Sequence, residues 1–350
     1  MVQSPVWQLH AGLTDSLTRS IVLPNRVNQF VAATPGETPY EVIYKEHPMQ
    51  VRRYGAPTDD DTPPFVLVYA LFNRPEILDL TPDRSVIRTL LDRDSPVYVV
   101  EWGSPTRLDG SLDIDDYVHR FLANAIRAIS RDAGHANVHL IGYSTGGTLA
   151  AMYAAVTDRG VGSLSVVAAP IGFDTSGGLF DVIDSSILPE DLVARSGVLQ
   201  GPMLSLGFSL VDPPEFLLGR YLRLYDVMLD TTQFTARGSR ISWSRDSVDV
   251  PSTAMATLVE IFRGDELVTG TFHIDGTAVD LSAIDIPVAA MVGQQDRFVP
   301  NDSTRALLDA VGTDETNLIR CDTGHLGLAT DNVAFGEAWP ALCRWLATLG

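Results

Sequence analysis

Residues 138–156 read VHLIGYSTGGTLAAMYAAV, and this stretch predicts the centre of the fold. Its first residues are mostly apolar and predict a strand buried on both faces, while the small residues after Ser144 predict a closely packed helix. Gly142, Ser144 and Gly146 form a G-x-S-x-G pattern at the junction. A serine at such a strand–turn–helix junction occupies a tight turn that lifts its hydroxyl above the sheet, so Ser144 is a predicted nucleophile. The alternative is an ordinary glycine-rich turn or a phosphate cradle, although the lysine of a P-loop is absent.

The same alternation of apolar runs and amphipathic segments extends on both sides of this stretch. Alternation of strand and helix is typical of a mostly parallel sheet covered by helices on both faces, which is an α/β fold. Strands are predicted at residues 41–46, 49–55, 63–72, 96–103, 138–144, 162–170, 287–293 and 317–322, and helices at 82–94, 112–132, 145–156, 302–311 and 332–349.

The alternation stops after Pro170 and resumes near residue 284. Residues 171–283 contain helical fragments and turn clusters without alternating buried strands, so they predict a cap inserted into the core. The core is then formed by residues 41–170 and 284–350. Residues 1–40 carry apolar positions at loosely helical spacing and predict an N-terminal helical segment.

A serine nucleophile needs a base and an acid that orients it, and in this architecture both follow the serine, acid first. His325 lies just past the last predicted strand and is the predicted base. His273 falls in a predicted cap hairpin and is expected at the surface. Asp296 follows the preceding predicted strand and is the predicted acid. Asp322 is the rival, but it is too close in sequence to His325 to occupy a separate strand end.

Two backbone amides are expected to form an oxyanion hole. The amide of Thr145, at the helix start, is the first. The second is expected in the loop ALFNRP after the strand at 63–72, from Leu71 or Phe72, and the sequence leaves this choice open. Packing of both side chains in the core is compatible with this role, because the backbone would act.

The charge balance excludes whole classes of partner. Acidic residues number 44 and basic residues 25, which gives a formal net charge of -19, and Lys45 is the single lysine. Nucleic acid and anionic membrane surfaces are therefore not expected partners. An acidic chain that is almost free of lysine indicates a protein that stays hydrated in strong salt, as in a haloarchaeal cytoplasm. A high-GC genome is the alternative source of the arginine bias.

The predicted compartment is a reducing cytoplasm. Cys321 and Cys343 are too few for a disulfide framework, and Cys321 is expected to be a buried strand residue. The N-terminus shows neither the basic nor the apolar region of a signal peptide. No apolar run reaches the roughly 18 residues that a transmembrane helix needs. No clustered His, Cys or Asp pattern predicts a metal.

Several longer segments resemble the polyhydroxyalkanoate synthases, a family of the α/β-hydrolase superfamily. They are most similar to the short class whose catalytic subunit works with a second protein. The resemblance runs from about Val42 to the C-terminus. It rests on LFNRPEILDLTPDRSVIRTLL (71–91), VYVVEWGSPTRLDGSLDIDDYV (97–118), WSRDSVDVPSTAMATLVEIF (243–262), GTAVDLSAIDIPV (276–288), GQQDRFVP (293–300) and GHLG (324–327).

The resemblance implies an acyltransferase that acts on 3-hydroxyacyl-CoA thioesters through a covalent acyl-enzyme. It supports the roles of Asp296, His325 and the Ser144 position. It implies no cofactor besides the CoA of the substrate, and partners that include a polyester chain, a second synthase subunit and a polymer granule. A homo-oligomer is left open. Asp116 and Tyr117 are typical of the family, and helix capping and packing are the simpler explanation for them. Trp243 and Asp246 match its cap motif and are treated as structural.

The sequence departs from this family at the nucleophile, where the synthases carry cysteine and this chain carries Ser144. A cysteine thioester keeps the acyl group activated, whereas a serine ester is no more activated than the polymer. Serine is also far less acidic than a thiol and depends more on its base. A serine esterase, thioesterase or polyhydroxyalkanoate depolymerase is therefore one alternative. A non-catalytic partner of a true synthase is the other.

CoA is a polyanion, so an acidic protein must hold local positive charge where CoA enters. Arg74, Arg107 and Arg297 are the candidate substrate-binding residues, because they stand next to loops expected to rim the site.

Overall fold

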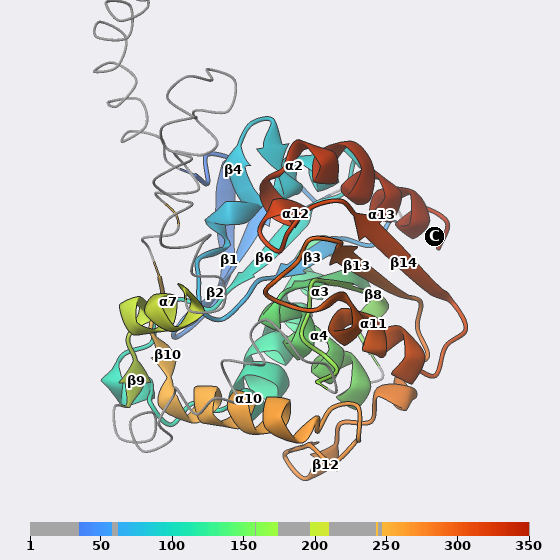
Figure 1. The fold of residues 1–350 in the computed structure, drawn as a ribbon. Helices are drawn as coiled ribbons and strands as arrows, with labels where there is room; N and C mark the ends of the chain where they lie inside the picture. Colours follow the sequence, from blue (N-terminus) through green and yellow to red (C-terminus); the bar gives the residue numbers. More distant parts are fainter. Residues whose placement is uncertain are drawn as a thin grey trace, which may run out of the picture.

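The computed structural model describes residues 35–57, 62–157, 159–173, 197–209, 243 and 247–349. These residues form one eight-stranded sheet with the strand order β1-β2-β6-β3-β7-β8-β13-β14 (Figure 1). The strands are β1 (Tyr40–Glu46), β2 (Met49–Tyr54), β3 (Phe65–Val68), β6 (Val97–Glu101), β7 (Val138–Tyr143), β8 (Val161–Val167), β13 (Val288–Gly293) and β14 (Thr316–Cys321).

The sheet is mostly parallel, as the sequence predicts. From β6 to β14 every neighbouring pair is parallel, and only β1–β2 and β2–β6 are antiparallel. The chain runs from β3 to β6 on one side of β3 and then returns to β7 on the other. The loops after β3 and β7 therefore leave the sheet side by side at a switch in strand order, where α/β folds place their ligands.

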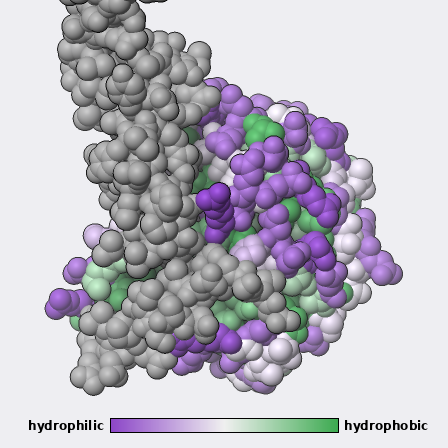
Figure 2. Space-filling view, in the orientation of Figure 1, coloured by the Kyte–Doolittle hydropathy of each residue, from purple (hydrophilic) through white to green (hydrophobic). Residues whose placement is uncertain are grey.

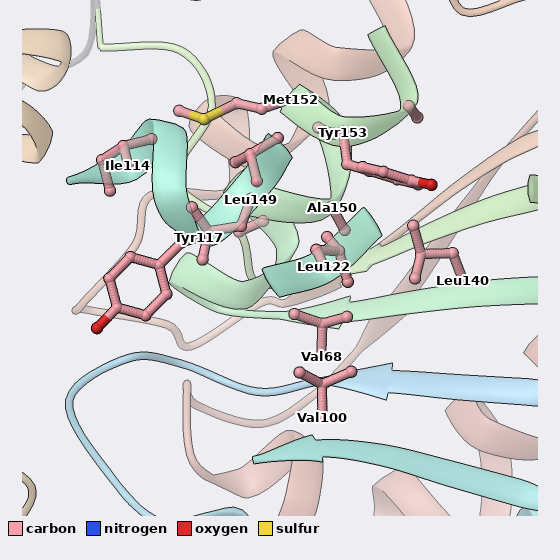
Figure 3. Close-up of a cluster of buried hydrophobic side chains, with 14 of the residues drawn as sticks. Val68, Val100, Ile114, Tyr117, Leu122, Leu140, Leu149, Ala150, Met152 and Tyr153 are labelled. Carbon is pink, nitrogen blue, oxygen red and sulfur yellow. The ribbon is translucent and has the colours of Figure 1, made fainter. Parts of the chain in front are cut away.

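Helices cover both faces of the sheet because the strand side chains alternate between two apolar clusters. On β3, Val66 and Val68 pack under the first group of helices, and Phe65 and Leu67 pack under the second group. Figure 3 shows part of the first cluster, with Val68, Val100 and Leu140 of three strands facing Leu149 and Ala150 of a helix. The first group is η3 (Asp116–Leu122), α3 (Ala123–Ala133), α4 (Thr145–Val156), α10 (Ser252–Gly264) and α11 (Asn301–Ala310), and the second is α2 (Val86–Leu91), α12 (Gly327–Thr330), η6 (Ala334–Ala338) and α13 (Trp339–Leu346).

The predicted helix at 82–94 is shorter in the structure, because Arg84 and Ser85 pair with β4 (Asp79–Thr81) before the helix begins. The hydroxyl of Ser85 then accepts a 3.0 Å hydrogen bond from the amide of Arg88 and caps α2. The predicted strand at 63–72 ends at Val68, so the residues from Tyr69 onwards form a loop. The remaining elements are β4 (Asp79–Thr81), β5 (Arg84–Ser85), β9 (Val198–Leu199), β10 (Val250–Pro251), β11 (His273–Ile274), β12 (Thr277–Ala278), α7 (Gly201–Ser209), η1 (Pro75–Leu78), η2 (Arg107–Asp109) and η5 (Leu281–Ala283).

The predicted division into an N-terminal segment, a core and a cap stays a prediction. Residues 1–34 and much of 171–283 lie outside the described residues. In the sheet, β8 and β13 are direct neighbours although more than a hundred residues separate them, and the described residues of this interval add no strand to the sheet.

The visible part of the described surface is mostly hydrophilic (Figure 2), in keeping with the charge of -19. Among the described residues, no helix combines the length and the apolar character that crossing a membrane requires.

Candidate active site

Ser144 stands at the junction of β7 and α4 in a backbone conformation that few residues adopt. Its φ is 53° and its ψ is -131°, and its amide donates a 2.8 Å hydrogen bond to the carbonyl of Val167 on β8. Such strain persists only where the surroundings enforce it. The flanking glycines show how tight the turn is, because a Cβ on Gly146 would lie 2.2 Å from the carbonyl oxygen of Val68. A Cβ on Gly142 would lie 2.3 Å from the backbone of the same turn.

His325 joins Ser144 to Asp296. Its Nε2 lies 3.1 Å from Oγ of Ser144, and its Nδ1 lies 2.8 Å from Oδ2 of Asp296. Because an ionised carboxylate only accepts hydrogen bonds, Nδ1 carries the proton and Nε2 offers its lone pair to the serine hydroxyl. The sequence placed these three residues on three different loops, and the structure brings them into one hydrogen-bonded chain.

Neighbouring groups hold both partners of Ser144 in place. Oδ1 of Asp296 accepts hydrogen bonds from the amides of Phe298 at 2.8 Å and Val299 at 2.9 Å, and the carboxylate is almost fully buried. The hydroxyl of Tyr143 donates a 2.6 Å hydrogen bond to the carbonyl of His325. The centroid of the Phe298 ring lies 5.1 Å from the centroid of the His325 imidazole. The sequence does not predict these supports, although Tyr143 stands next to Ser144 and Phe298 follows Arg297.

The loop after β3 lies against the start of α4. The amide of Leu71 donates a 3.3 Å hydrogen bond to Oγ1 of Thr145, so it points to the residue that follows Ser144. The carbonyl of Phe72 instead accepts a 3.2 Å hydrogen bond from the amide of Val248. The structure thus places the Leu71 amide beside the side chain of Thr145, and the oxyanion-hole role of Leu71 or Phe72 stays a prediction.

The rivals for the base and the acid make other contacts. His273 is exposed on the β11–β12 hairpin, and its Nδ1 contacts the carbonyl of Thr271 at 2.9 Å. The carboxylate of Asp322 accepts a hydrogen bond from the side chain of Gln295 at 2.9 Å.

The three candidate arginines have different surroundings. Arg74 is half-buried, with its guanidinium 3.5 Å from Glu101 and 3.4 Å from Oγ of Ser104. Arg107 begins η2 and is exposed, and Arg297 is exposed directly after Asp296. Of these three arginines, Arg107 and Arg297 are the exposed ones.

The described residues among Asp116, Tyr117 and Trp243, which the family resemblance singled out, make contacts that support the fold. The carboxylate of Asp116 accepts a 3.0 Å hydrogen bond from the amide of Asp113 at the helix start, and Tyr117 packs edge-on against Trp102. Trp243 is buried and donates a 2.7 Å hydrogen bond to the carbonyl of Arg74, while Asp246 lies outside the described residues.

Neither cysteine resembles a nucleophile. Both are buried, and burial raises the pKa of the Cys321 thiol to about 11 and also raises the pKa of Cys343. Thiols of this kind are inert. Within the part of the chain that the structure describes, no group of three or more His, Cys, Asp or Glu side chains is arranged to hold a metal ion.

The fold, the strained serine and the hydrogen-bonded chain define an α/β hydrolase, and the model described as "Alpha/beta hydrolase family" matches residues 75–338. A monoacylglycerol lipase from Paleococcus ferrophilus shares the fold with a TM-score of 0.56 and 14% identity, over 86% of this chain and 99% of the lipase. A soluble variant of monoglyceride lipase from Saccharomyces cerevisiae gives a TM-score of 0.58 and 14% identity, over 91% of this chain and 97% of that structure.

Comparison with known sequences identifies the family within the α/β hydrolases. The chain is 34% identical to "Poly(3-hydroxyalkanoate) polymerase subunit PhaC" from Haloferax mediterranei, over 99% of this chain and 70% of the relative. It is 32% identical to the protein of the same name from Haloarcula marismortui, over 95% of this chain and 73% of the relative. The chain belongs to the family of poly(3-hydroxyalkanoate) polymerase PhaC subunits, within the α/β hydrolases.

Proposed function

We propose that this protein is an acyltransferase that takes 3-hydroxyacyl-CoA thioesters and forms a covalent acyl-enzyme on Ser144. The observation that carries the proposal is the position of His325, within hydrogen-bonding distance of both Ser144 and Asp296. Such an arrangement activates a serine toward acyl carbons. The polymerase names of the family supply the substrate class.

In the first half-reaction, Nε2 of His325 takes the proton of the Ser144 hydroxyl while Oγ attacks the thioester carbonyl. The amide of Thr145 donates to the oxyanion, and so does the amide of Leu71, which exchanges Oγ1 of Thr145 for it. Asp296 stabilises the imidazolium. As the tetrahedral intermediate collapses, the carbon–sulfur bond breaks and His325 returns the proton to the thiolate of CoA. The products are free CoA and an ester on Ser144.

In the second half-reaction, His325 takes a proton from an acceptor hydroxyl, which attacks the acyl-serine. The carbon–oxygen bond to Ser144 breaks and the serine recovers its proton. If the acceptor is the end of a polyester chain, the polymer grows by one unit. If the acceptor is water, a free hydroxy acid leaves.

Ser144 favours a second candidate function, which is hydrolysis of the same thioesters or of polyester. Loading an oxygen ester from a thioester is downhill, but passing the acyl group from one oxygen ester to another is nearly balanced. Water is abundant and drives the acyl-serine to free acid, so hydrolysis competes with elongation unless the site excludes water.

The proposal extends to the setting of the reaction. We place the protein in a reducing cytoplasm at the surface of polymer granules, with a second synthase subunit as partner. The support is the word "subunit" in the names of the relatives and the acidic composition. Its two relatives from Haloferax mediterranei and Haloarcula marismortui are from halophilic archaea, which supports the expectation of a salt-adapted protein.

The test is to incubate the purified chain with 3-hydroxybutyryl-CoA and to follow free CoA, free acid and polymer together. CoA release with polymer supports the synthase, and CoA release with free acid alone supports the hydrolase. Ser144→Ala is the control and must abolish both. Ser144→Cys shows whether a thioester intermediate shifts the products from acid to polymer. Folded wild type that releases no CoA contradicts the synthase and the thioesterase, and leaves hydrolysis of polyester or a non-catalytic partner.

A further inference from the structure

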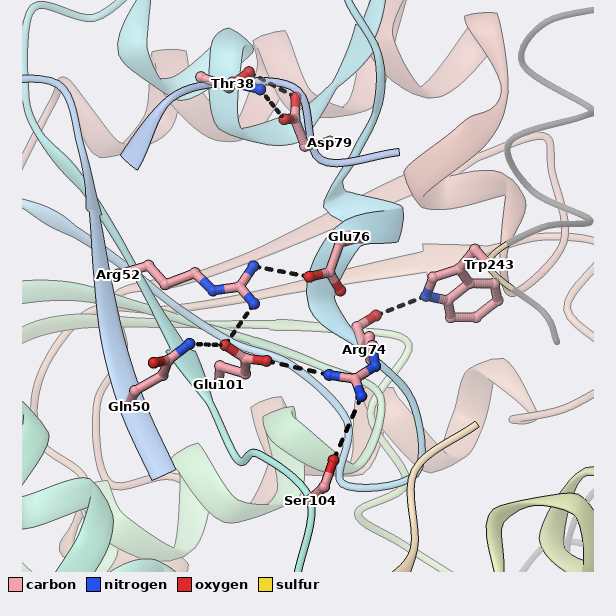
Figure 4. A network of polar contacts seen from close by, with 9 residues as sticks. All are labelled: Thr38, Gln50, Arg52, Arg74, Glu76, Asp79, Glu101, Ser104 and Trp243. Carbon is pink, nitrogen blue, oxygen red and sulfur yellow. Dashed lines mark hydrogen bonds and ion pairs between the residues drawn. The ribbon is translucent and has the colours of Figure 1, made fainter. Parts of the chain in front are cut away.

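A buried network of charged side chains ties down the loop that carries the Leu71 amide. Glu101, the last residue of β6, stands at its centre (Figure 4). Its side chain is 7% exposed. One carboxylate oxygen contacts the guanidinium of Arg52 at 2.5 Å and also accepts a hydrogen bond from the side-chain amide of Gln50. The other oxygen lies 3.5 Å from the guanidinium of Arg74. Glu101 therefore bridges strand β2 and the loop after β3.

The same end of β6 holds the loop at both its beginning and its end. At the beginning, Nε1 of Trp102 donates a 2.8 Å hydrogen bond to the carbonyl of Tyr69. At the end, Arg74 meets Glu101, and Glu76 accepts a 2.9 Å hydrogen bond from Arg52. Residues 70–73, which include the Leu71 amide, span the interval between these anchors.

A small space lies beside the loop, although the loop residues Tyr69 to Phe72 are themselves buried. A cavity of ≈ 10 Å³ lies there, lined in part by Leu71, Arg74, Glu101 and Trp102. Such a volume has room for about one water molecule. The two carboxylates keep Arg52 charged. Burial disfavours its charged form, but the charges of Glu101 and Glu76 outweigh this effect and raise the pKa of Arg52.

We propose that Glu101 is a positioning residue that, through Arg74, holds the loop after β3 so that the Leu71 amide faces the oxyanion formed on Ser144. This inference rests on the proposed function, because it concerns the same acyl transfer. It also gives the half-buried Arg74 a role other than binding CoA. If the amide moves by a fraction of its hydrogen-bond length, its stabilisation of the transition state falls more than its stabilisation of the ground state.

The test uses a neutral ester, p-nitrophenyl butyrate, which lacks the phosphates of CoA. Glu101→Gln removes the charge that holds Arg74. Arg74→Gln removes the guanidinium through which the loop contacts Glu101, while leaving the Arg52–Glu101 pair in place. Both variants should lower kcat by about tenfold or more with little change in KM, less than the 10²–10³ typical for complete loss of an oxyanion donor. Both should weaken inhibition by butylboronic acid, whose serine adduct places an oxygen in the oxyanion hole, by a similar factor. Glu101→Asp, which keeps the charge, should retain part of the kcat and part of the inhibition that Glu101→Gln loses.

Arg53→Gln is the matched control, because Arg53 lies next to Arg52 on β2 but pairs with Asp132 at 2.9 Å instead of with the loop. It should lower the melting temperature without changing kcat or inhibition. Unchanged kcat and inhibition in folded Arg74→Gln, with an active wild type, overturn this inference alone. An equal loss of kcat in Arg53→Gln also overturns it, since a general loss of stability then explains the effect. A wild type that neither cleaves the ester nor binds the boronic acid overturns the proposed function and this inference with it.

Discussion

The carboxylate of Asp296 lies 2.8 Å from Nδ1 of His325, while its second oxygen accepts two backbone amides of its own loop. This arrangement fixes both the rotamer of the acid and the tautomer of the base. Asp296→Asn keeps the shape but can donate to Nδ1, which favours the wrong tautomer. We expect kcat/KM to fall by about 10⁴ with little change in melting temperature. A fall of less than about tenfold would show that Asp296 does not orient the base.

The turn at Ser144 leaves no space for a side chain at Gly146. A Cβ there would lie 2.2 Å from the carbonyl oxygen of Val68, which belongs to β3 and cannot swing aside. Gly146→Ala should therefore lower the free energy of unfolding by about 3 kcal/mol and reduce acylation of Ser144. Chemical denaturation measures the first effect. Gly336→Ala is the control, because a Cβ at Gly336 meets nothing within 4 Å. Equal stability of the two variants would contradict the account of the turn.

How far the sequence predicts this site depends on where each residue stands. Ser144, Asp296 and His325 each follow a predicted strand, and parallel strands bring their carboxyl ends to one edge, so their proximity was predictable. Glu101 was not, because it stands in the apolar run VYVVEW and reads as an ordinary strand position. Its partner Arg52 is on an antiparallel strand whose register only the folded sheet reveals. The sequence also leaves open whether Leu71 or Phe72 supplies the second amide, and only the folded loop shows that the Leu71 amide contacts Oγ1 of Thr145.

His139 is buried at the opposite end of β7, where its Nδ1 contacts Oγ of Ser163 at 2.8 Å and its ring stacks on Phe65. Burial lowers the pKa of His139 from 6.5 to about 4. The unfolded chain therefore binds a proton below pH 6.5 that the folded chain accepts only near pH 4. Stability is full above pH 6.5 and falls as the pH drops toward 4, by on the order of 3 kcal/mol from this group.

His139→Asn should flatten the pH dependence of the unfolding free energy between pH 6.5 and 4. His273→Asn, at an exposed position, is the control and should keep the wild-type profile. Denaturation curves at several pH values measure the slope. A His139→Asn profile that superimposes on the wild type would refute the assignment.

The charge of -19 predicts a response to salt. Mutual repulsion among acidic groups destabilises the folded state, and salt shortens its range to about 3 Å at 1 M. The melting temperature should therefore rise from low salt to molar potassium chloride. A melting temperature that is indifferent to salt would favour the explanation that genome composition alone sets the arginine bias.

The central claim is that Ser144 accepts the acyl group, and mass spectrometry of the intact protein tests it most directly. After rapid mixing with 3-hydroxybutyryl-CoA and quenching in acid, the wild type should gain one 3-hydroxybutyryl group, located on the peptide that contains Ser144. His325→Gln should slow the gain, and Ser144→Ala should abolish it. A folded wild type that gains no acyl group while releasing CoA, or an adduct that persists in Ser144→Ala, would contradict the account.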